Sequence, residues 1–395
     1  MSEAKAHRYE LDLLRLLAAL WVVAFHVLYG NHILGFNPVG YPKAVQAVAK
    51  YAYVAMPIFF FISGFVILSS ASGRTARSFA TSRLARLYPA YWACVTITFL
   101  LINTAGTRHI SIADYLINMT MLEGFLFHPL VDAVYWTLQV ELIFYGLVWL
   151  TLVTGQMKRF RSVLWGWTIV CALTTLVQIS GHTVPNRIVV ATGYGAYFVV
   201  GAAAYLYVKG DKGRSVVTLL AASSALSLVR AYFDGRSLRA MYHSINVGVG
   251  VALVAVGLVL CLAIALEHFP KVPGRPWMVW AGLLTYPVYL LHDEVSNVLF
   301  TRWHTLNRWV LLLVVMAMVV AVSWAVNVAI ERPLAPRLRR VLNKGWDRVV
   351  AFRAPTRPSP TPSPAAVGPI GPVTLVDTVG PVSPAVPTAQ PAPPS

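Results

Sequence analysis

The stretch that decides the fold is Leu11–Tyr29, LDLLRLLAALWVVAFHVLY, an apolar run that carries an arginine and a histidine. One helix of this length crosses the roughly 30 Å hydrocarbon core of a bilayer. Arg15 and His26 are separated by about 16 Å of helical rise and three turns, so both project from nearly the same side, with Asp12 about a quarter-turn away. Ionisable groups in hydrocarbon usually face a bundle interior or a wet cavity. The alternative is structural: His26 bonded to a neighbouring helix and Arg15 reaching the headgroups.

The composition is that of an integral membrane protein. Of 395 residues, 57% are hydrophobic and 12% are charged, whereas soluble domains carry about twice this charged fraction. The net charge of +17 would suit nucleic acid, but the basic residues form short groups between apolar spans, which is the pattern of membrane topology. The three cysteines lie inside apolar runs, without disulfide or metal-site spacing. We therefore expect the lipid bilayer as a partner, and neither nucleic acid nor a metal ion.

About ten membrane-spanning helices are expected, since each apolar run is long enough for the hydrocarbon core. Lys and Arg gather in the loops on the side of the N-terminus, so both termini are predicted to be cytoplasmic. The outer loop 105–133 is long enough to hide a re-entrant or broken element that hydropathy would not detect. The predicted class is therefore an all-α, polytopic membrane protein. The expected spans are 11–30, 52–70, 88–104, 134–154, 162–180, 188–208, 215–231, 244–266, 277–300 and 308–330.

The last part of the chain differs from the rest in composition. From about Ala354 it is rich in proline, interleaved with Ser, Thr, Ala and Val. Such a segment cannot bury enough apolar surface to form a core. The sequence thus predicts a transmembrane domain over residues 1–345 and a disordered, Pro-rich cytoplasmic tail over residues 354–395.

Three ionisable groups, His26, Glu141 and His292, are predicted to lie within a turn or two of one depth, in the outer half of the membrane. Glu141 is the one carboxylate expected deep inside a span, and a buried carboxylate requires a cationic or hydrogen-bonding partner. A histidine at the same depth would supply it. The alternative is a structural bond from Glu141 to a histidine or tyrosine that ties two helices together.

A histidine held by a carboxylate can take a proton from a hydroxyl group. The sequence contains no G-x-S-x-G elbow and no cysteine in a polar setting. We therefore expect direct chemistry, in which His26 deprotonates an acceptor alcohol that attacks an activated acyl group. Glu141 would orient or polarise His26, or position the acceptor.

The cytoplasmic end of the third span is strongly basic. Arg83 and Arg86 are three residues apart and share a helix face, and Pro89 is able to start the membrane-embedded part of that helix. Positive charge at this place suits an anionic ligand such as a nucleotide phosphate. Ordinary loop charge or lipid headgroup binding is the alternative. Arg15, one turn inside the same surface, favours the ligand.

These motifs resemble those of the acyltransferase family 3 membrane proteins, over roughly residues 9–335. Six motifs occur in the order and at the spacing that the family shows. They fall on Arg15 with His26, Phe59–Phe65 with Ser63 and Gly64, Arg83 with Arg86 and Pro89, Trp136–Glu141, Tyr289–His292, and Glu331–Pro333. The chain departs from the family at Leu13 and Leu16, where glycines are usual, and at Pro287, which is expected to kink the ninth helix just before His292.

The resemblance implies transfer of an acetyl, succinyl or longer acyl group from cytoplasmic acyl-coenzyme A to a hydroxyl of a cell-envelope glycan or glycolipid. Acyl-coenzyme A would be the donor substrate, with no permanently bound cofactor, at a bacterial plasma membrane. His26 would be catalytic with Glu141 and Arg15, and Arg15, Arg83 and Arg86 would hold the donor. Further candidates for the acceptor or the carbonyl oxygen are Ser63, Tyr135, Trp136, Thr137, His292 and Asp12.

Other functions are compatible with the same residues. A transporter or flippase for an envelope intermediate also tolerates buried Arg, Glu and His, although the sequence shows no inverted repeat. A membrane-bound O-acyltransferase of the other large class would use a histidine without the arginine motifs. A small secondary metabolite such as a macrolide is an alternative acceptor. Consumption of thioester separates acyl transfer from transport.

Overall fold

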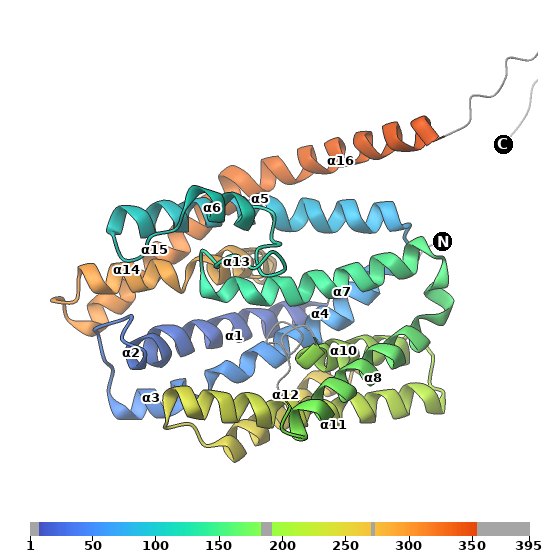
Figure 1. Ribbon diagram of the computed structural model, residues 1–395, viewed down its shortest axis with the longest axis horizontal. Helices are drawn as coiled ribbons and strands as arrows, with labels where there is room; N and C mark the ends of the chain where they lie inside the picture. Colours follow the sequence, from blue (N-terminus) through green and yellow to red (C-terminus); the bar gives the residue numbers. More distant parts are fainter. Residues whose placement is uncertain (1–7, 183–191, 270–272, 354–395) are drawn as a thin grey trace, which may run out of the picture. The chain divides into compact units, whose positions relative to one another are not determined.

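The computed structural model describes residues 8–182, 192–269 and 273–353, and every regular element within them is a helix. Eight helical segments in this described part are long and apolar enough to cross a membrane, so the chain is an all-α, multi-pass membrane protein (Figure 1). These segments are Tyr9–Ile33, Lys43–Ala71, Ala76–Ala105, Ala133–Val153, Gln156–Ile179, Arg214–Tyr242, Val247–Ala265 and Arg308–Arg348.

The individual helices follow the apolar runs of the sequence. They are α1 (Tyr9–Phe25), α2 (Asn31–Ile33), α3 (Lys43–Ala49), α4 (Ala55–Ala71), α5 (Ala76–Ala105), α6 (Ile112–Asn118), α7 (Trp136–Val153), α8 (Phe160–Ile179), α10 (Gly195–Val208), α11 (Arg214–Tyr242), α12 (Val247–Ala265), α13 (Pro276–Leu291), α14 (Glu294–Arg302), α15 (Arg308–Val326) and α16 (Arg332–Arg353). Two π-helical turns, η1 (His26–Gly30) and η5 (Asn327–Glu331), follow α1 and α15.

Each of the ten expected spans coincides with a described helix, but two of these helices are short. Helix α10 has 14 residues and α13 has 16, and the start of the sixth expected span lies outside the described residues. The count of ten and the cytoplasmic termini stay predictions. Helix α16 runs through the predicted domain end at residue 345, and the predicted tail, residues 354–395, lies outside the described residues.

Helices α4 and α10 pack closely because glycine lies at their contact. Gly64 on α4 lies against the carbonyl group of Phe198, and Gly201 on α10 lies against that of Phe61. A Cβ atom at either glycine would overlap the facing backbone. Small residues at such crossings let membrane helices approach closely. Close packing matters here, because moving an apolar side chain from lipid into a helix interface gains no hydrophobic free energy.

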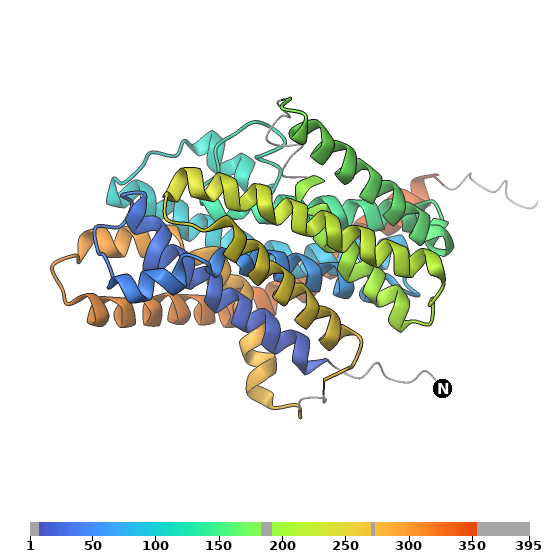
Figure 2. The same cartoon turned by 90° about the horizontal axis from the view of Figure 1, so that it is seen from below.

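Helix α1 packs against both α4 and α13, and Figure 2 shows its N-terminal part beside α13. The polar stripe that the sequence predicts on α1 therefore faces other helices, as the cost of charge in hydrocarbon requires.

The ninth expected span is interrupted within the membrane protein's core. Helix α13 contains Pro287, ends at Leu291, and is followed by α14 from Glu294. The predicted kink before His292 is therefore a break that His292 and Asp293 occupy. Both side chains are buried, at 0% and 4% exposure. Broken helices at membrane depth are tolerated where their backbone is buried in protein or lines a cavity.

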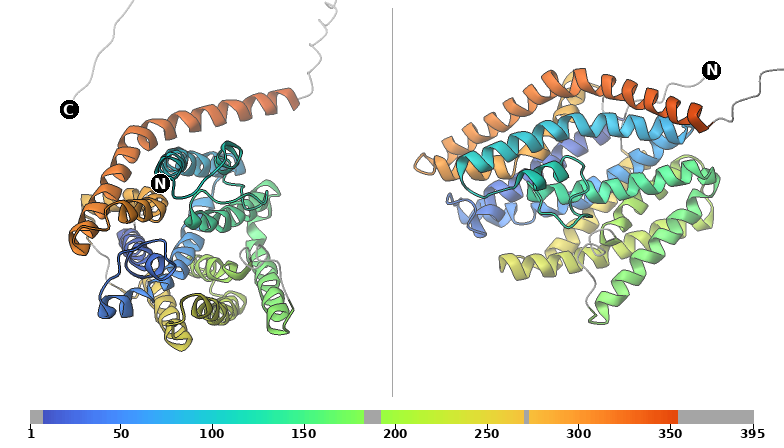
Figure 3. Two further views of the ribbon diagram at one scale, coloured as in Figure 1. Left: turned by 60° about the vertical axis from the view of Figure 1, so that its left-hand side comes forward. Right: turned by 45° about the horizontal axis from the view of Figure 1, so that its top comes forward.

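The loop 105–133 contains a short helix, α6, that folds back on α5; whether it re-enters the membrane stays a prediction. Helix α6 returns beside α5, where the Tyr115 ring stacks on Phe99 with 4.5 Å between centroids and its hydroxyl lies 2.9 Å from Thr96 Oγ1. Figure 3 shows this loop folding back along α5 (right panel).

Side chains of α5 satisfy the backbone of this loop. The carbonyl oxygens of residues 118, 119 and 120 accept hydrogen bonds from Tyr91, Trp92 and Tyr88, at 2.8, 2.9 and 2.8 Å. These donors precede the end of α5 by roughly 20–25 Å of helical rise. Irregular backbone survives at such depth only where protein groups bond it, so α5 is what holds the loop in place.

A buried ion pair lies within α11 and is contacted by Tyr194, the residue before α10. Arg230 and Asp234, one turn apart on α11, form a salt bridge, and their side chains are 10% and 14% exposed. Tyr194 donates from its hydroxyl to Asp234 Oδ1 at 3.2 Å, and its ring centroid lies 4.9 Å beneath the guanidinium of Arg230. This arginine thus has a carboxylate and an aromatic face of its own.

Candidate active site

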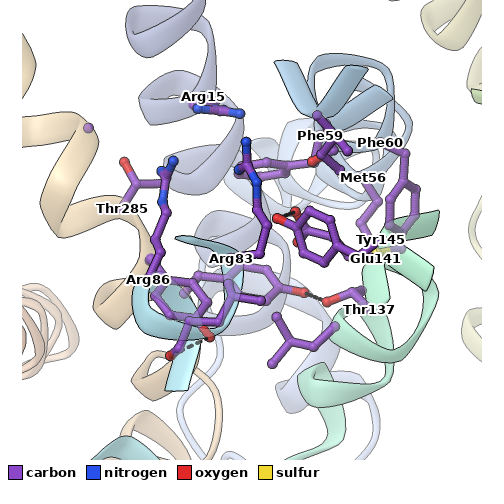
Figure 4. Close-up of a pocket in the computed structure, with 17 residues that line it drawn as sticks. Arg15, Met56, Phe59, Phe60, Arg83, Arg86, Thr137, Glu141, Tyr145 and Thr285 are labelled. Carbon is purple, nitrogen blue, oxygen red and sulfur yellow. Dashed lines mark hydrogen bonds between the residues drawn. The ribbon is translucent and has the colours of Figure 1, made fainter. Parts of the chain in front are cut away.

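A cavity of about 130 Å³ lies between α1, α4, α5, α7 and α13 (Figure 4). Its lining contains three guanidinium groups, one carboxylate, several hydroxyl groups and apolar side chains. The lining residues are Arg15, Met56, Phe59, Phe60, Ser63, Ile67, Arg83, Arg86, Leu87, Thr137, Leu138, Glu141, Tyr145, Gly282, Thr285, Tyr286 and Tyr289.

The arginines come from two helices. Arg15 is on α1, whereas Arg83 and Arg86 are one turn apart on α5 and extend toward Arg15 (Figure 4). The structure thus brings together the three arginines that the sequence assigns to the donor. Because Glu141 is the one carboxylate in the lining, the cavity carries excess positive charge. Like charges in a low-dielectric interior repel strongly, so an anionic ligand would reduce the repulsion among the three guanidinium groups.

The protein satisfies these arginines only in part. Arg83 donates to Ser70 Oγ, and its guanidinium lies 5.6 and 5.5 Å from the ring centroids of Phe79 and Tyr145. Its Nε has no partner among the described residues. Arg15 and Arg86 make no hydrogen bond or ion pair with any residue that the structure describes. Donors are therefore available to a phosphate or carboxylate.

The expected pairing of Glu141 with His26 is wrong. Tyr145, one turn further along α7, donates from its hydroxyl to Glu141 Oε1 at 2.7 Å. Glu141 lines the arginine cavity, and His26 does not. The predicted depths placed both groups in one layer, but helical rise alone does not tell which neighbouring helix each side chain faces.

The carboxylate beside His26 is that of Asp293, in the break between α13 and α14. His26 Nδ1 lies 3.4 Å from Asp293 Oδ1, and Asn31 donates from Nδ2 to the same oxygen at 2.6 Å. A π turn makes this possible, because the backbone bond from Asn31 to the His26 carbonyl spans five residues. In a regular α-helix residues five apart diverge by about 140°, whereas here both reach one carboxylate.

His292 lies beside this pair. Its ring centroid is 5.2 Å from that of His26. Its Nδ1 lies 2.7 Å from the carbonyl oxygen of Tyr289, and since a carbonyl only accepts, Nδ1 carries a proton. The buried Nε2 has no partner among the described residues. The structure therefore brings His26 and His292 together, as the sequence predicts.

Tyr289 links the arginine cavity to the histidines. Its side chain lines the cavity, and its ring centroid is 5.5 Å from that of His292. Its hydroxyl lies 2.7 Å from Thr137 Oγ1, which donates to the Val134 carbonyl at 3.0 Å. Tyr289 therefore contacts both a hydroxyl group of the cavity lining and the ring of His292.

The remaining predicted residues divide into two groups. Ser63 and Thr137 line the cavity. The other three lie outside the cavity lining. Tyr135 donates from its hydroxyl to the Leu290 carbonyl at 3.2 Å, and the ring centroid of Trp136 lies 4.9 Å from that of Tyr194. Asp12 lies near Gly282 on α13. Their predicted roles stay predictions.

Sequence reasoning missed Asp293, Asn31 and Tyr289. A signal for Asp293 was present, because this carboxylate directly follows His292 within an expected span. The rule applied to Glu141, that an intramembrane carboxylate marks a site, applies equally to Asp293. Asn31 had no such signal, since its position depends on the π turn.

The geometry defines a class of protein: a multi-pass helical membrane protein with a cationic cavity and, next to Tyr289 and His292, a histidine–aspartate pair capable of proton transfer. The Acyl_transf_3 family model, described as an acyltransferase domain, matches residues 8–328. The chain therefore belongs to acyltransferase family 3, which confirms the resemblance seen in its motifs, and it is a membrane acyltransferase. No match was found among curated proteins or solved structures.

Proposed function

We propose that this protein transfers an acetyl, succinyl or longer acyl group from cytoplasmic acyl-coenzyme A to a hydroxyl of a cell-envelope glycan or glycolipid, in a bacterial plasma membrane. One observation supports the proposal: the cavity holds three guanidinium groups against one carboxylate, and Tyr289 in its lining contacts His292, which lies beside the His26–Asp293 pair. Coenzyme A is polyanionic at one end and carries the reactive thioester at the other. The arginines of the cavity would bind the phosphates, and His26 would act at the thioester.

The donor would enter from the cytoplasmic side with its phosphates on Arg83, Arg86 and Arg15. Guanidinium groups bind phosphate through charge-assisted, often bidentate hydrogen bonds. Arg86 is exposed and would meet the phosphates first. The pantetheine arm would extend along the apolar lining, past Phe59, and deliver the thioester to Thr137 and Tyr289.

His26 would act as the general base. Its Nδ1 faces the Asp293 carboxylate, so Nδ1 carries the proton and Nε2 has the free lone pair. As Nε2 takes the acceptor's proton, the acceptor oxygen attacks the thioester carbonyl carbon. The tetrahedral intermediate then expels the thiolate, which takes the proton back from His26. Alcohol and thioester thus become ester and thiol, while Asp293 stabilises the transient imidazolium.

The carbonyl oxygen needs a hydrogen-bond donor while negative charge develops on it. Ser63 and Thr137 are the sequence candidates that line the cavity, and Tyr289 joins them. We assign this role to the Thr137–Tyr289 pair, because Tyr289 contacts His292. Their mutual hydrogen bond would be exchanged for one to the substrate.

The test is release of coenzyme A thiol by purified protein given acetyl-, succinyl- or palmitoyl-coenzyme A, with envelope extract as acceptor. We expect His26→Ala to lower turnover about 10²–10⁴-fold, the usual value of general-base catalysis. Asp293→Asn should lower it less, without loss of donor binding. Arg239→Gln, far from the cavity, is the matched control. Thiol release that is indifferent to His26 would overturn the mechanism.

A transporter or flippase is the second candidate, favoured by the break at His292 and Asp293, because transporters bind substrates at discontinuous helices. Such a protein would move an envelope intermediate without consuming thioester. Failure to release thiol from any donor, combined with movement of the intermediate in proteoliposomes, would establish it. Thiol release that requires a macrolide instead of envelope extract would keep the reaction and change the acceptor.

A further inference from the structure

Helix α16 has two chemically different faces. Leu334, Leu338 and Leu342 recur every four residues and form an apolar stripe along one side. Asn343 and Asp347 lie on the other side, roughly opposite the stripe at 100° per residue. The helix directly follows α15 and η5, where the last expected span, residues 308–330, ends.

The polar face of α16 is bound to the rest of the protein. Arg77, at the start of α5, donates from Nε and Nη2 to the side-chain and backbone oxygens of Asn343, at 3.3 and 2.9 Å. It also forms an ion pair with Asp347. Because the polar face contacts α5, the apolar stripe is turned away from it. Figure 3 shows α16 running past the start of α5 (right panel), where Asn343 and Asp347 make these contacts.

Exposed cations and two exposed apolar side chains surround the stripe. Val341 is 64% exposed and Trp346 is 37% exposed. The cations form no ion pair with any carboxylate in the described part of the chain. The exposed cations of α16, beyond Arg332 at its start, are Arg337, Arg339, Arg340, Lys344 and Arg348.

We propose that α16 lies on the membrane surface and binds anionic phospholipids of the leaflet in which α15 ends. The leucine stripe and Trp346 would enter the boundary between headgroups and acyl chains, while four of the cations, Arg337, Arg339, Lys344 and Arg348, reach the phosphates. Arg340 lies on the side of Asn343 and Asp347. An apolar stripe flanked by Lys and Arg, with an aromatic residue, is how interfacial helices bind. The lipid is expected to be anionic because the exposed side chains are cationic. The helix is expected to reach it because α16 directly follows α15, a membrane-spanning helix. This proposal is independent of the proposed reaction.

The experiment uses the full-length protein in nanodiscs of phosphatidylcholine alone or with about 30 mol% phosphatidylglycerol. Each cation near an anionic surface strengthens binding about fivefold. We expect amide hydrogen exchange over residues 334–348 to slow at least about tenfold in the anionic discs at low salt. High salt should reverse the effect, because it screens exposed charge.

Two variants separate charge from fold. Replacing the five cations by glutamine should abolish the lipid dependence, whereas Arg236→Gln with Arg239→Gln, two exposed cations at the end of α11, should retain it. Quenching by brominated lipid should also decrease in Trp346→Phe.

Three outcomes would overturn the proposal. The first is equal exchange in both kinds of disc. The second is protection that appears in detergent on addition of coenzyme A, which would assign the cations to the donor. The third is protection that requires a soluble protein.

Discussion

The protein contains two groups of arginine within its membrane-embedded part, and the two groups differ in how many carboxylates they have as partners. Arg230 has its own carboxylate on the next turn, and Tyr194 contacts both partners. In the cavity, Arg15, Arg83 and Arg86 share one carboxylate, Glu141, which Tyr145 already binds. Arg230 therefore has one carboxylate to itself, whereas three arginines of the cavity share one.

The difference teaches how to distinguish structural from functional charge in a membrane protein. Burial alone does not separate the groups, because Arg83 and Arg230 are 9% and 8% exposed. What separates them is the supply of partners. Breaking a satisfied pair leaves an uncompensated charge, whereas removing one cation from an overcharged cavity relieves repulsion. Four predictions follow from this contrast.

Asp234→Ala is expected to have the largest effect on stability. It leaves Arg230 buried without its carboxylate, which costs about 3–5 kcal/mol of unfolding free energy. The double variant Arg230→Met with Asp234→Leu should recover most of this loss, because no charge is left unpaired. Thermal unfolding in detergent measures both. Equal stability of Asp234→Ala and wild type would place Arg230 in the functional group.

Arg86→Gln is expected to weaken donor binding and leave folding intact. Loss of charge-assisted hydrogen bonds worth about 1.5–3 kcal/mol lowers affinity for coenzyme A roughly 10–100-fold. Thermal stability should be unchanged or higher, because repulsion among the cavity arginines falls. Calorimetric titration with coenzyme A gives the affinity. Arg86→Lys should recover part of it, since lysine keeps the charge but lacks the planar fork.

Ionic strength should affect the cavity arginines and Arg230 differently. Raising ionic strength from about 0.05 to 0.5 M is expected to weaken coenzyme A binding roughly two- to fivefold, because Arg86 is exposed and its contacts are screened. The stability difference between wild type and Asp234→Ala should not change, because the Arg230 pair is buried. A stability difference that follows ionic strength would mean that water reaches that pair.

The smallest effect is expected at Asp114 and His128, a pair in the loop 105–133, outside the candidate membrane-spanning segments. The Ser111 hydroxyl and the His128 ring lower the pKa of Asp114 from its ordinary value of 3.8. A lowered carboxyl pKa means that the stabilisation is present above about pH 3.8 and is lost as pH falls through the still lower folded-state pKa.

Asp114→Asn should accordingly loosen the loop modestly at pH 7. The side chains of Asp114 and His128 are 20% and 36% exposed, and exposed pairs contribute little. Hydrogen exchange over residues 106–132 reports the loosening. Below the lowered pKa of Asp114 the wild type and the variant should converge, and a difference that persists there would exclude the ion pair as its source.

The sequence predicts the spans well, because lipid selects for apolar length, and it predicts the arginine cavity, because helical phase brings Arg83 and Arg86 onto one face. It fails where the helix is irregular. The partner of His26 depends on a π turn at residues 26–30 and on the break at His292 and Asp293, and neither leaves a periodic signal. Helix α6 also escapes hydropathy, since its depth is set by hydrogen bonds from aromatic side chains of α5.

The π turn after α1 has a consequence for the length of the chain. It inserts one extra residue into a helix that otherwise repeats every 3.6 residues. Straightening this turn without changing the number of residues would therefore set His26 and Asn31 about 140° apart, away from a common carboxylate. Deleting one residue between them would restore a regular helix and keep both side chains on one face, because they would then be four residues apart. At this position the match between the number of residues and the shape of the turn, more than the chemistry of any one side chain, determines whether His26 is aligned with Asp293.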